Sequence, residues 1–132
     1  MESSLSVWAP RVLSILRIAA ALTFMSHGLM KLWGFPAPQE GAPDPLPTML
    51  LVAAWLEVVG GGLLVLGLFT RPAAFILSGM MAVAYFMAHF PKSPYPALNG
   101  GEPAYLFCFI FFYLIFAGGG AWSLDVMLRK KT

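Results

Sequence analysis

The sequence predicts an all-α integral membrane protein, a bundle of four transmembrane helices that forms a single domain over residues 1–132. Apolar residues make up 59% of the chain and charged residues only 11%, which is too little charge to cover a soluble domain of this size. The chain also contains four long apolar runs, and a helix needs about 20 such residues to cross the hydrocarbon core of a bilayer. The length of these runs, and their lack of period-two alternation, favour helices over strands.

The element boundaries follow from proline and glycine. The third and fourth runs each open with a proline, Pro72 and Pro103, which suits a first helical turn because the missing N–H has no partner there. Loops rich in proline and glycine separate the runs, and the glycines at 118–120 suit a helix end. We therefore expect helices at about residues 12–33, 48–69, 72–90 and 103–119, and a short interfacial tail at 122–131.

The basic residues indicate an orientation. With four spans, both termini lie on the same side as the turn at Arg71. That side also holds Arg11 and the basic tail from Arg129 to Lys131, whereas acidic residues accompany the lysines on the other side. The positive-inside rule then predicts that the N and C termini are cytoplasmic.

Three basic residues interrupt the first apolar run. At about 3.6 residues per turn, Arg17, His27 and Lys31 share one helical face. A charge in hydrocarbon should face the bundle interior and be paired, and Glu57 in the second span is the candidate partner. We expect a buried ion-pair network of Arg17, Glu57 and His27, with Lys31 extending toward the outer interface and His89 at a similar level.

Two interpretations of this polar face remain open. The network of Arg17 with Glu57 is either a structural latch that sets helix register, or part of a site for a quinone or another small headgroup. In the second case the ligand-binding residues are His27, Lys31, Glu57 and His89, because a quinone carbonyl needs a hydrogen-bond donor and its reduction needs a proton carrier. No haem or other metal is predicted, since no haem-attachment motif occurs and the two histidines differ in depth.

Other function classes are excluded by composition. A net charge of +2, without basic runs interleaved with aromatic residues, argues against nucleic-acid binding. The single cysteine, Cys108, cannot form an internal disulfide or a redox pair. Any redox role must therefore use a bound cofactor, a substrate or a partner's thiols.

Three segments carry a family resemblance. They are "HGLMKLWGF" from His27, "LEVVGGGLLVLGLFTR" around Glu57, and "GGGAWSLD" near the C-terminus. Together they resemble the DoxX family of small four-helix membrane proteins, which is named after a subunit of an archaeal quinol oxidase and thiosulfate:quinone oxidoreductase system. The resemblance implies a bacterial plasma (inner) membrane location and a link to quinones and to sulfur-compound or oxidative-stress chemistry. Its structural motif residues are Gly60, Gly61, Gly67, Arg71, Trp122, Ser123 and Asp125.

Three functions remain as hypotheses. The favoured one is a quinone-linked redox protein, or the membrane subunit of an oxidoreductase complex, with quinone as the expected cofactor. The others are a non-catalytic scaffold that recruits a soluble redox partner, and a small transporter or proton relay. Besides the lipid bilayer, an oxidoreductase or a second copy of the chain are the expected partners. Whether the protein is itself an enzyme is left open.

Overall fold

The computed structural model describes residues 3–130, and within them every regular element is helical. The all-α prediction is therefore confirmed. The elements are α1 (Ser4–Trp33), α2 (Thr48–Leu66), α3 (Thr70–Ala84), the π-helical turn η1 (Tyr85–His89), α4 (Pro96–Asn99), α5 (Glu102–Ala117) and α6 (Leu124–Lys130).

Three of the described helices are long and apolar enough to cross a membrane: α1, α2, and α3 continued by η1. The fourth predicted span corresponds to α5, an apolar helix of 16 residues. At 1.5 Å per residue, α5 is roughly 24 Å long, which is less than the ~30 Å of a typical hydrocarbon core.

Helix ends differ from the predicted ones for local reasons. Helix α1 begins at Ser4 instead of residue 12, because the Ser3 side chain accepts the Ser6 N–H at 3.3 Å and caps an extra N-terminal segment. Helix α2 ends at Leu66, before the predicted residue 69, because Gly67 adopts a left-handed conformation with φ 69°. The third helix changes to π geometry at Tyr85, so its last turn is wider than predicted.

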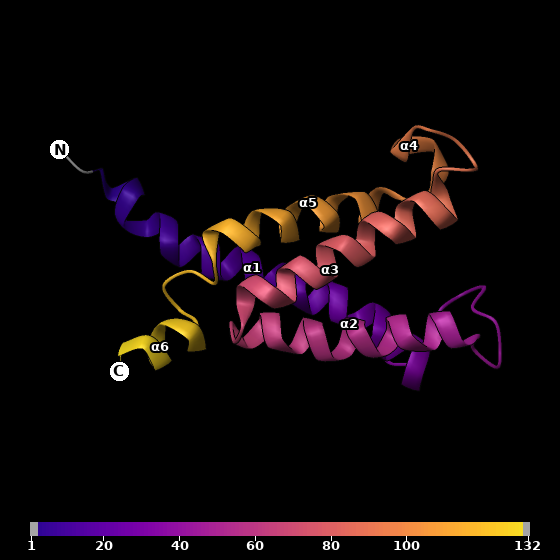
Figure 1. Ribbon diagram of the computed structural model, residues 1–132, viewed down its shortest axis with the longest axis horizontal. Coiled ribbons are helices and arrows are strands. Elements are labelled where there is room, and N and C mark those ends of the chain that lie inside the picture. The colour runs from indigo at the N-terminus through magenta and orange to yellow at the C-terminus, as the bar shows by residue number, and fades with distance from the viewer. Residues whose placement is uncertain (1–2, 131–132) are drawn as a thin grey trace.

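The bundle consists of two helix pairs. Helix α1 packs along α2, and α3 packs along α5, whereas α1 has few contacts with α5 (Figure 1). The start of α1, helix α6 and the α2–α3 turn lie at one end of the bundle, here called the terminal end. Helix α4 and the loop between α1 and α2 lie at the other end, here called the loop end.

Glycines allow the helices to approach closely. A Cβ on Gly28 of α1 would lie 2.6 Å from the Ala54 carbonyl oxygen of α2, and one on Gly61 would lie 2.9 Å from the Met25 Cβ. Gly60 faces α3 in the same way, because an added Cβ would lie 2.9 Å from the Leu77 side chain. Gly60 and Gly61, two of the motif residues of the family resemblance, therefore serve close helix packing.

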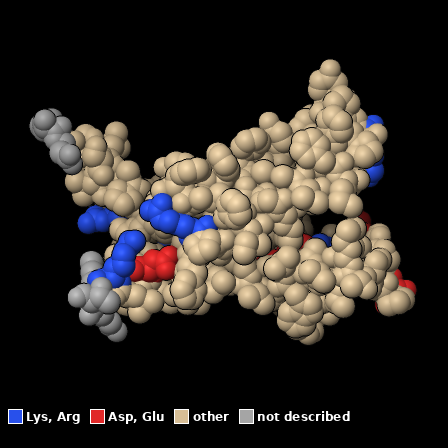
Figure 2. All heavy atoms as spheres, viewed as in Figure 1, with Lys and Arg blue, Asp and Glu red and all other residues tan. Residues whose placement is uncertain are grey.

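An apolar layer separates the two ends. Its centre is Phe24 of α1, whose ring meets Phe107 and Phe111 of α5 edge-on at 5.4 and 5.0 Å. On the face shown in Figure 2, the Lys, Arg, Asp and Glu side chains gather toward the two ends of the molecule. Large apolar side chains also cover the outward faces, as expected for contact with lipid; they include Leu22, Trp55, Phe75 and Phe112.

Candidate functional site

Arg17 lies at the terminal end of the bundle and is only 1% exposed. Its guanidinium donates to the carbonyl oxygens of Gly119, Trp122 (3.0 Å) and Val65 (3.3 Å). No hydrogen bond or ion pair joins it to Glu57 among the described residues. The predicted Arg17–Glu57 pair is therefore wrong. A helical side chain points toward its own N-terminus, where the end of α2 and the chain after α5 offer unpaired carbonyls.

The C-terminal segment is fastened to this end by backbone contacts. The Trp122 N–H donates to the Ser14 hydroxyl at 2.9 Å, although the Trp122 ring is exposed. Ser123 is buried, and its hydroxyl accepts the Val126 N–H at 3.3 Å, which caps α6. Gly67 is required opposite it, because an added Cβ would lie 2.5 Å from the Ser123 Cβ.

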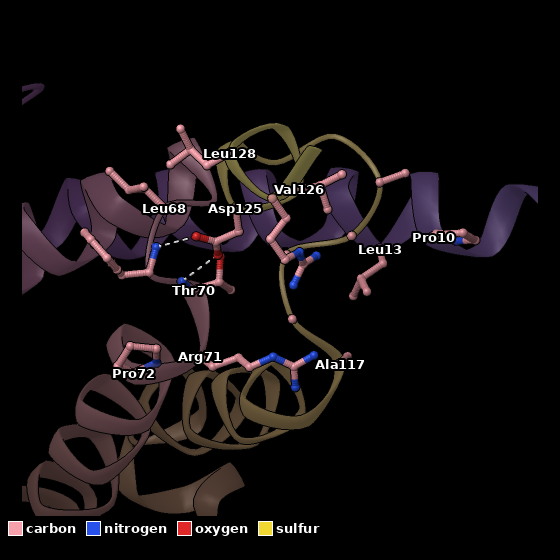
Figure 3. Close-up of a pocket in the computed structure, with 16 residues that line it drawn as sticks. Pro10, Leu13, Leu68, Thr70, Arg71, Pro72, Ala117, Asp125, Val126 and Leu128 are labelled. Atoms are coloured by element: carbon pink, nitrogen blue, oxygen red, sulfur yellow. Dashed lines mark hydrogen bonds between the residues drawn. The ribbon is translucent and has the colours of Figure 1, made fainter. Parts of the chain in front are cut away.

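Asp125 caps a helix distant in sequence. Its carboxylate accepts the N–H groups of Phe69 (2.8 Å) and Thr70 (3.0 Å) at the start of α3 (Figure 3). Burial acts to raise the pKa of Asp125, but these hydrogen bonds and the charge of Arg129 together hold it below its usual value. The contact also holds Phe69 in a left-handed conformation, with φ 50°, which a non-glycine residue rarely adopts.

The loop end contains a pocket of about 280 Å³ between the two helix pairs. His27, Lys31, Glu57 and His89 all line it. These are the four residues that the sequence predicts to bind a ligand, and the structure brings them to one cavity. Its apolar wall includes Phe24, Met80, Met81 and Phe107.

Glu57 and Lys31 form the ion pair of this pocket. The Lys31 Nζ lies 2.6 Å from Glu57 Oε1, and the two side chains are 14% and 4% exposed. Lys31 was expected to extend outward, and that expectation is wrong. Gly28 brings α1 so close to α2 that an added Cβ would lie 2.9 Å from the Glu57 Cβ, and Lys31 follows Gly28 by about one turn. The second carboxylate oxygen, Oε2, is buried and has no hydrogen-bond partner among the residues that the structure describes.

The two histidines are placed differently. The His27 ring lies edge-on to Phe107 at 6.2 Å, and the described residues contain no hydrogen bond between His27 and Glu57, so this part of the predicted network is also wrong. His89 Nδ1 lies 3.2 Å from the Asn99 carbonyl oxygen, which can only accept. Nδ1 therefore carries the proton, and Nε2 of a neutral His89 is left as an acceptor.

Sequence reasoning missed the residues that hold His89. Asn99 is buried, and its amide donates to Tyr85 Oη at 3.1 Å and to the Ser93 carbonyl at 2.9 Å. Its Oδ1 accepts the Gly101 N–H at 2.8 Å. The "NGG" turn was a signal, since asparagine before glycine suits a tight turn. Its link to Tyr85 depends on the π turn and has no sequence signature.

The described residues contain no group of three or more His, Cys, Asp or Glu side chains that could hold a metal ion. What the pocket offers is an ammonium donor, a carboxylate with one free oxygen, and two imidazoles beside aromatic and methionine side chains. This combination suits a small, partly apolar molecule with hydrogen-bonding groups.

Comparison with known proteins identifies the family. The DoxX family model matches residues 12–90. An uncharacterized protein of Haemophilus influenzae is 44% identical over 133 residues, covering 98% of this chain and 99% of that protein. Inner membrane protein YphA of Escherichia coli is 40% identical over 70 residues, or 49% of each chain. No solved structure matches. Because the family model spans more than half of the chain, and three helices can cross a bilayer, this is a membrane protein of the DoxX family.

Proposed function

We propose that this protein binds a quinone headgroup in the loop-end pocket and acts as a quinone-linked redox protein or as the membrane subunit of an oxidoreductase complex. The observation that carries the proposal is Glu57 Oε2, a buried carboxylate oxygen without a partner beside an ammonium group and two imidazoles. An ionised carboxylate oxygen only accepts, and a buried acceptor is expensive unless a ligand or water donates to it, as the hydroxyl of a reduced quinone would.

The donor set fits a quinone. Lys31 and His27 line the pocket and would donate to a quinone carbonyl oxygen, and the wall of Phe24 and Phe107 suits a planar ring. When bound, a quinone supplies two-electron, two-proton redox chemistry. The residues of this chain would orient the ring, and Glu57 and His89 would hold or pass the protons. Cys108 is a lone thiol, so we assign the supply of electrons to a partner oxidoreductase.

The proposal places the protein in the bacterial inner membrane, as the name of the YphA relative suggests. We include α5 as a short fourth span, because it is apolar after Glu102 and packs along α3, and a bilayer can thin to match a short helix. Arg11, Arg71 and Arg129 at the terminal end favour cytoplasmic termini. A C-terminal alkaline-phosphatase fusion that is active in the periplasm would contradict this orientation.

A binding measurement tests the quinone site. The protein is purified in mild detergent, and a short-chain ubiquinone analogue is titrated while tryptophan fluorescence is recorded. We expect saturable binding. His27→Ala and Lys31→Met should each lower the affinity at least tenfold, because each removes a hydrogen-bond donor to the quinone. The control is Lys92→Met, because Lys92 is exposed and does not line the pocket. Equal binding by all variants, or none by the wild type, overturns the proposal.

The alternatives separate in the same experiment. A proton relay is disfavoured because fully buried Phe24, Leu64 and Leu77 lie between the polar groups of the two ends. A scaffold would bind no quinone and would instead retain a soluble redox partner during mild purification.

A further inference from the structure

A second, larger pocket of about 730 Å³ opens at the terminal end (Figure 3). It lies between the N-terminal part of α1, the start of α3, the glycines that follow α5, and α6. Its walls combine two arginines, Arg71 and Arg129, with apolar side chains that include Leu13, Leu68 and Leu128. Nothing in the quinone proposal uses this cavity, which lies at the opposite end of the molecule from Glu57.

Arg71 is only partly used by the fold. Its Nη1 donates to the carbonyl oxygens of Ile115 (3.0 Å) and Phe116 (2.6 Å) in the last turn of α5. No hydrogen bond from Nε or Nη2 is found among the described residues, and the side chain is exposed. Figure 3 shows the Arg71 side chain extending along the pocket toward Ala117. Gly118 leaves it room, because an added Cβ would lie 3.2 Å from Nη2.

The charge of the pocket is positive overall. Two guanidinium groups line it, and among the described residues Asp125 is the only acidic one in the lining. The Asp125 carboxylate is engaged by the N–H groups of Phe69 and Thr70 and also interacts with the charge of Arg129, so the excess positive charge of the lining comes from Arg71. Figure 2 shows basic atoms gathered at this end around one acidic patch. The pocket therefore favours an anion, and planar guanidinium groups match the oxygens of a phosphate in particular.

We propose that this pocket binds the headgroup of an anionic phospholipid, with the phosphate held by Arg71 and Arg129. The adjoining leucines, Leu13, Leu68 and Leu128, would contact the first carbons of the acyl chains. Free phosphate carries the same charge but has no acyl chain to contact these apolar walls. Basic pockets at the membrane surface of helical proteins suit lipid headgroups in this way. The site requires that the protein lies in a membrane and does not depend on the quinone proposal.

Lipid binding to delipidated protein in a neutral maltoside detergent tests the site. Native mass spectrometry and thermal unfolding are recorded with phosphatidylglycerol, with phosphatidylcholine and with inorganic phosphate. We expect phosphatidylglycerol to bind more tightly than phosphatidylcholine and to raise the Tm of the protein. Its affinity should fall as salt is added. Arg71→Gln and Arg129→Gln should each lower the affinity for phosphatidylglycerol about fivefold, or ~1 kcal/mol per arginine.

Controls separate binding from folding. Arg11 lies at the same end but does not line the pocket; its guanidinium stacks on the Trp8 ring at 4.8 Å. The Arg11→Gln variant should therefore bind phosphatidylglycerol as tightly as the wild type. Arg71→Lys retains the charge and should bind better than Arg71→Gln even if both lower the Tm. Equal affinity for the two lipids, equal loss in Arg11→Gln, or equal stabilisation by inorganic phosphate would each overturn the lipid assignment.

Discussion

The Lys31–Glu57 pair makes a quantitative prediction about stability. At an effective dielectric constant of 20, charges 2.6 Å apart attract by roughly 6 kcal/mol. Desolvation of two buried ions removes several kcal/mol each, so the pair itself contributes little net stability. Removing one partner is different, because the remaining charge stays buried without compensation, at about 3–5 kcal/mol. Since Lys31 is 14% exposed and Glu57 only 4%, we expect the lower limit, about 3 kcal/mol, for Glu57→Leu, which leaves Lys31 unpaired, and a larger loss for Lys31→Met.

A double-mutant cycle measures this coupling. Lys31→Met, Glu57→Leu and the double variant are unfolded in mixed micelles of maltoside and dodecyl sulfate, and helix content is followed by circular dichroism. Each single change should lower the free energy of unfolding by about 3–5 kcal/mol, and the double variant should lie within ~1 kcal/mol of the wild type. Lys92→Met reports the effect of removing an exposed lysine. If the two single effects simply add in the double variant, the buried ion pair does not exist.

Three further predictions concern packing and the terminal end. Gly28→Ala should lower the free energy of unfolding by about 1–3 kcal/mol. Gly79 has open space around it, so Gly79→Ala should raise the free energy of unfolding by up to ~1 kcal/mol. Equal effects of the two changes in chemical unfolding would refute the close contact at Gly28. Arg17→Lys should lower the free energy of unfolding by about 2 kcal/mol and speed hydrogen exchange at residues 118–123, because one ammonium group cannot reach three carbonyls. Unchanged exchange at these residues would contradict the role of Arg17. The pKa of Asp125 is lowered in the folded state, so its contribution is present above the ordinary value of 3.8 and is lost as the pH falls through the folded pKa. The Tm of the wild type should therefore fall more than that of Asp125→Asn between pH 5 and pH 3, about one unit either side of that value, and parallel Tm profiles would disprove the cap.

The helices could be predicted from the sequence because the properties that make them are local. Apolar length, proline at a first turn and glycine at a helix end act within a few residues. The same is true of the helical face that holds His27 and Lys31, since periodicity places residues on a face without knowledge of the fold. The loop-end pocket therefore contains the four expected side chains. Helix α5 lies within two residues of the predicted span, whereas the change to π geometry at Tyr85 was not predicted.

Partner choice could not be predicted in this way. Sequence periodicity placed Arg17, His27 and Lys31 on one face, and Glu57 was the one acid inside a predicted span. Which base reaches that acid depends on the contact at Gly28 between α1 and α2. Arg17 instead finds carbonyl oxygens of a chain segment about a hundred positions later, and backbone acceptors of this kind leave no mark on the sequence. Composition and periodicity thus establish a membrane bundle with two polar layers, and the close approach of its helices selects the pairs within each layer.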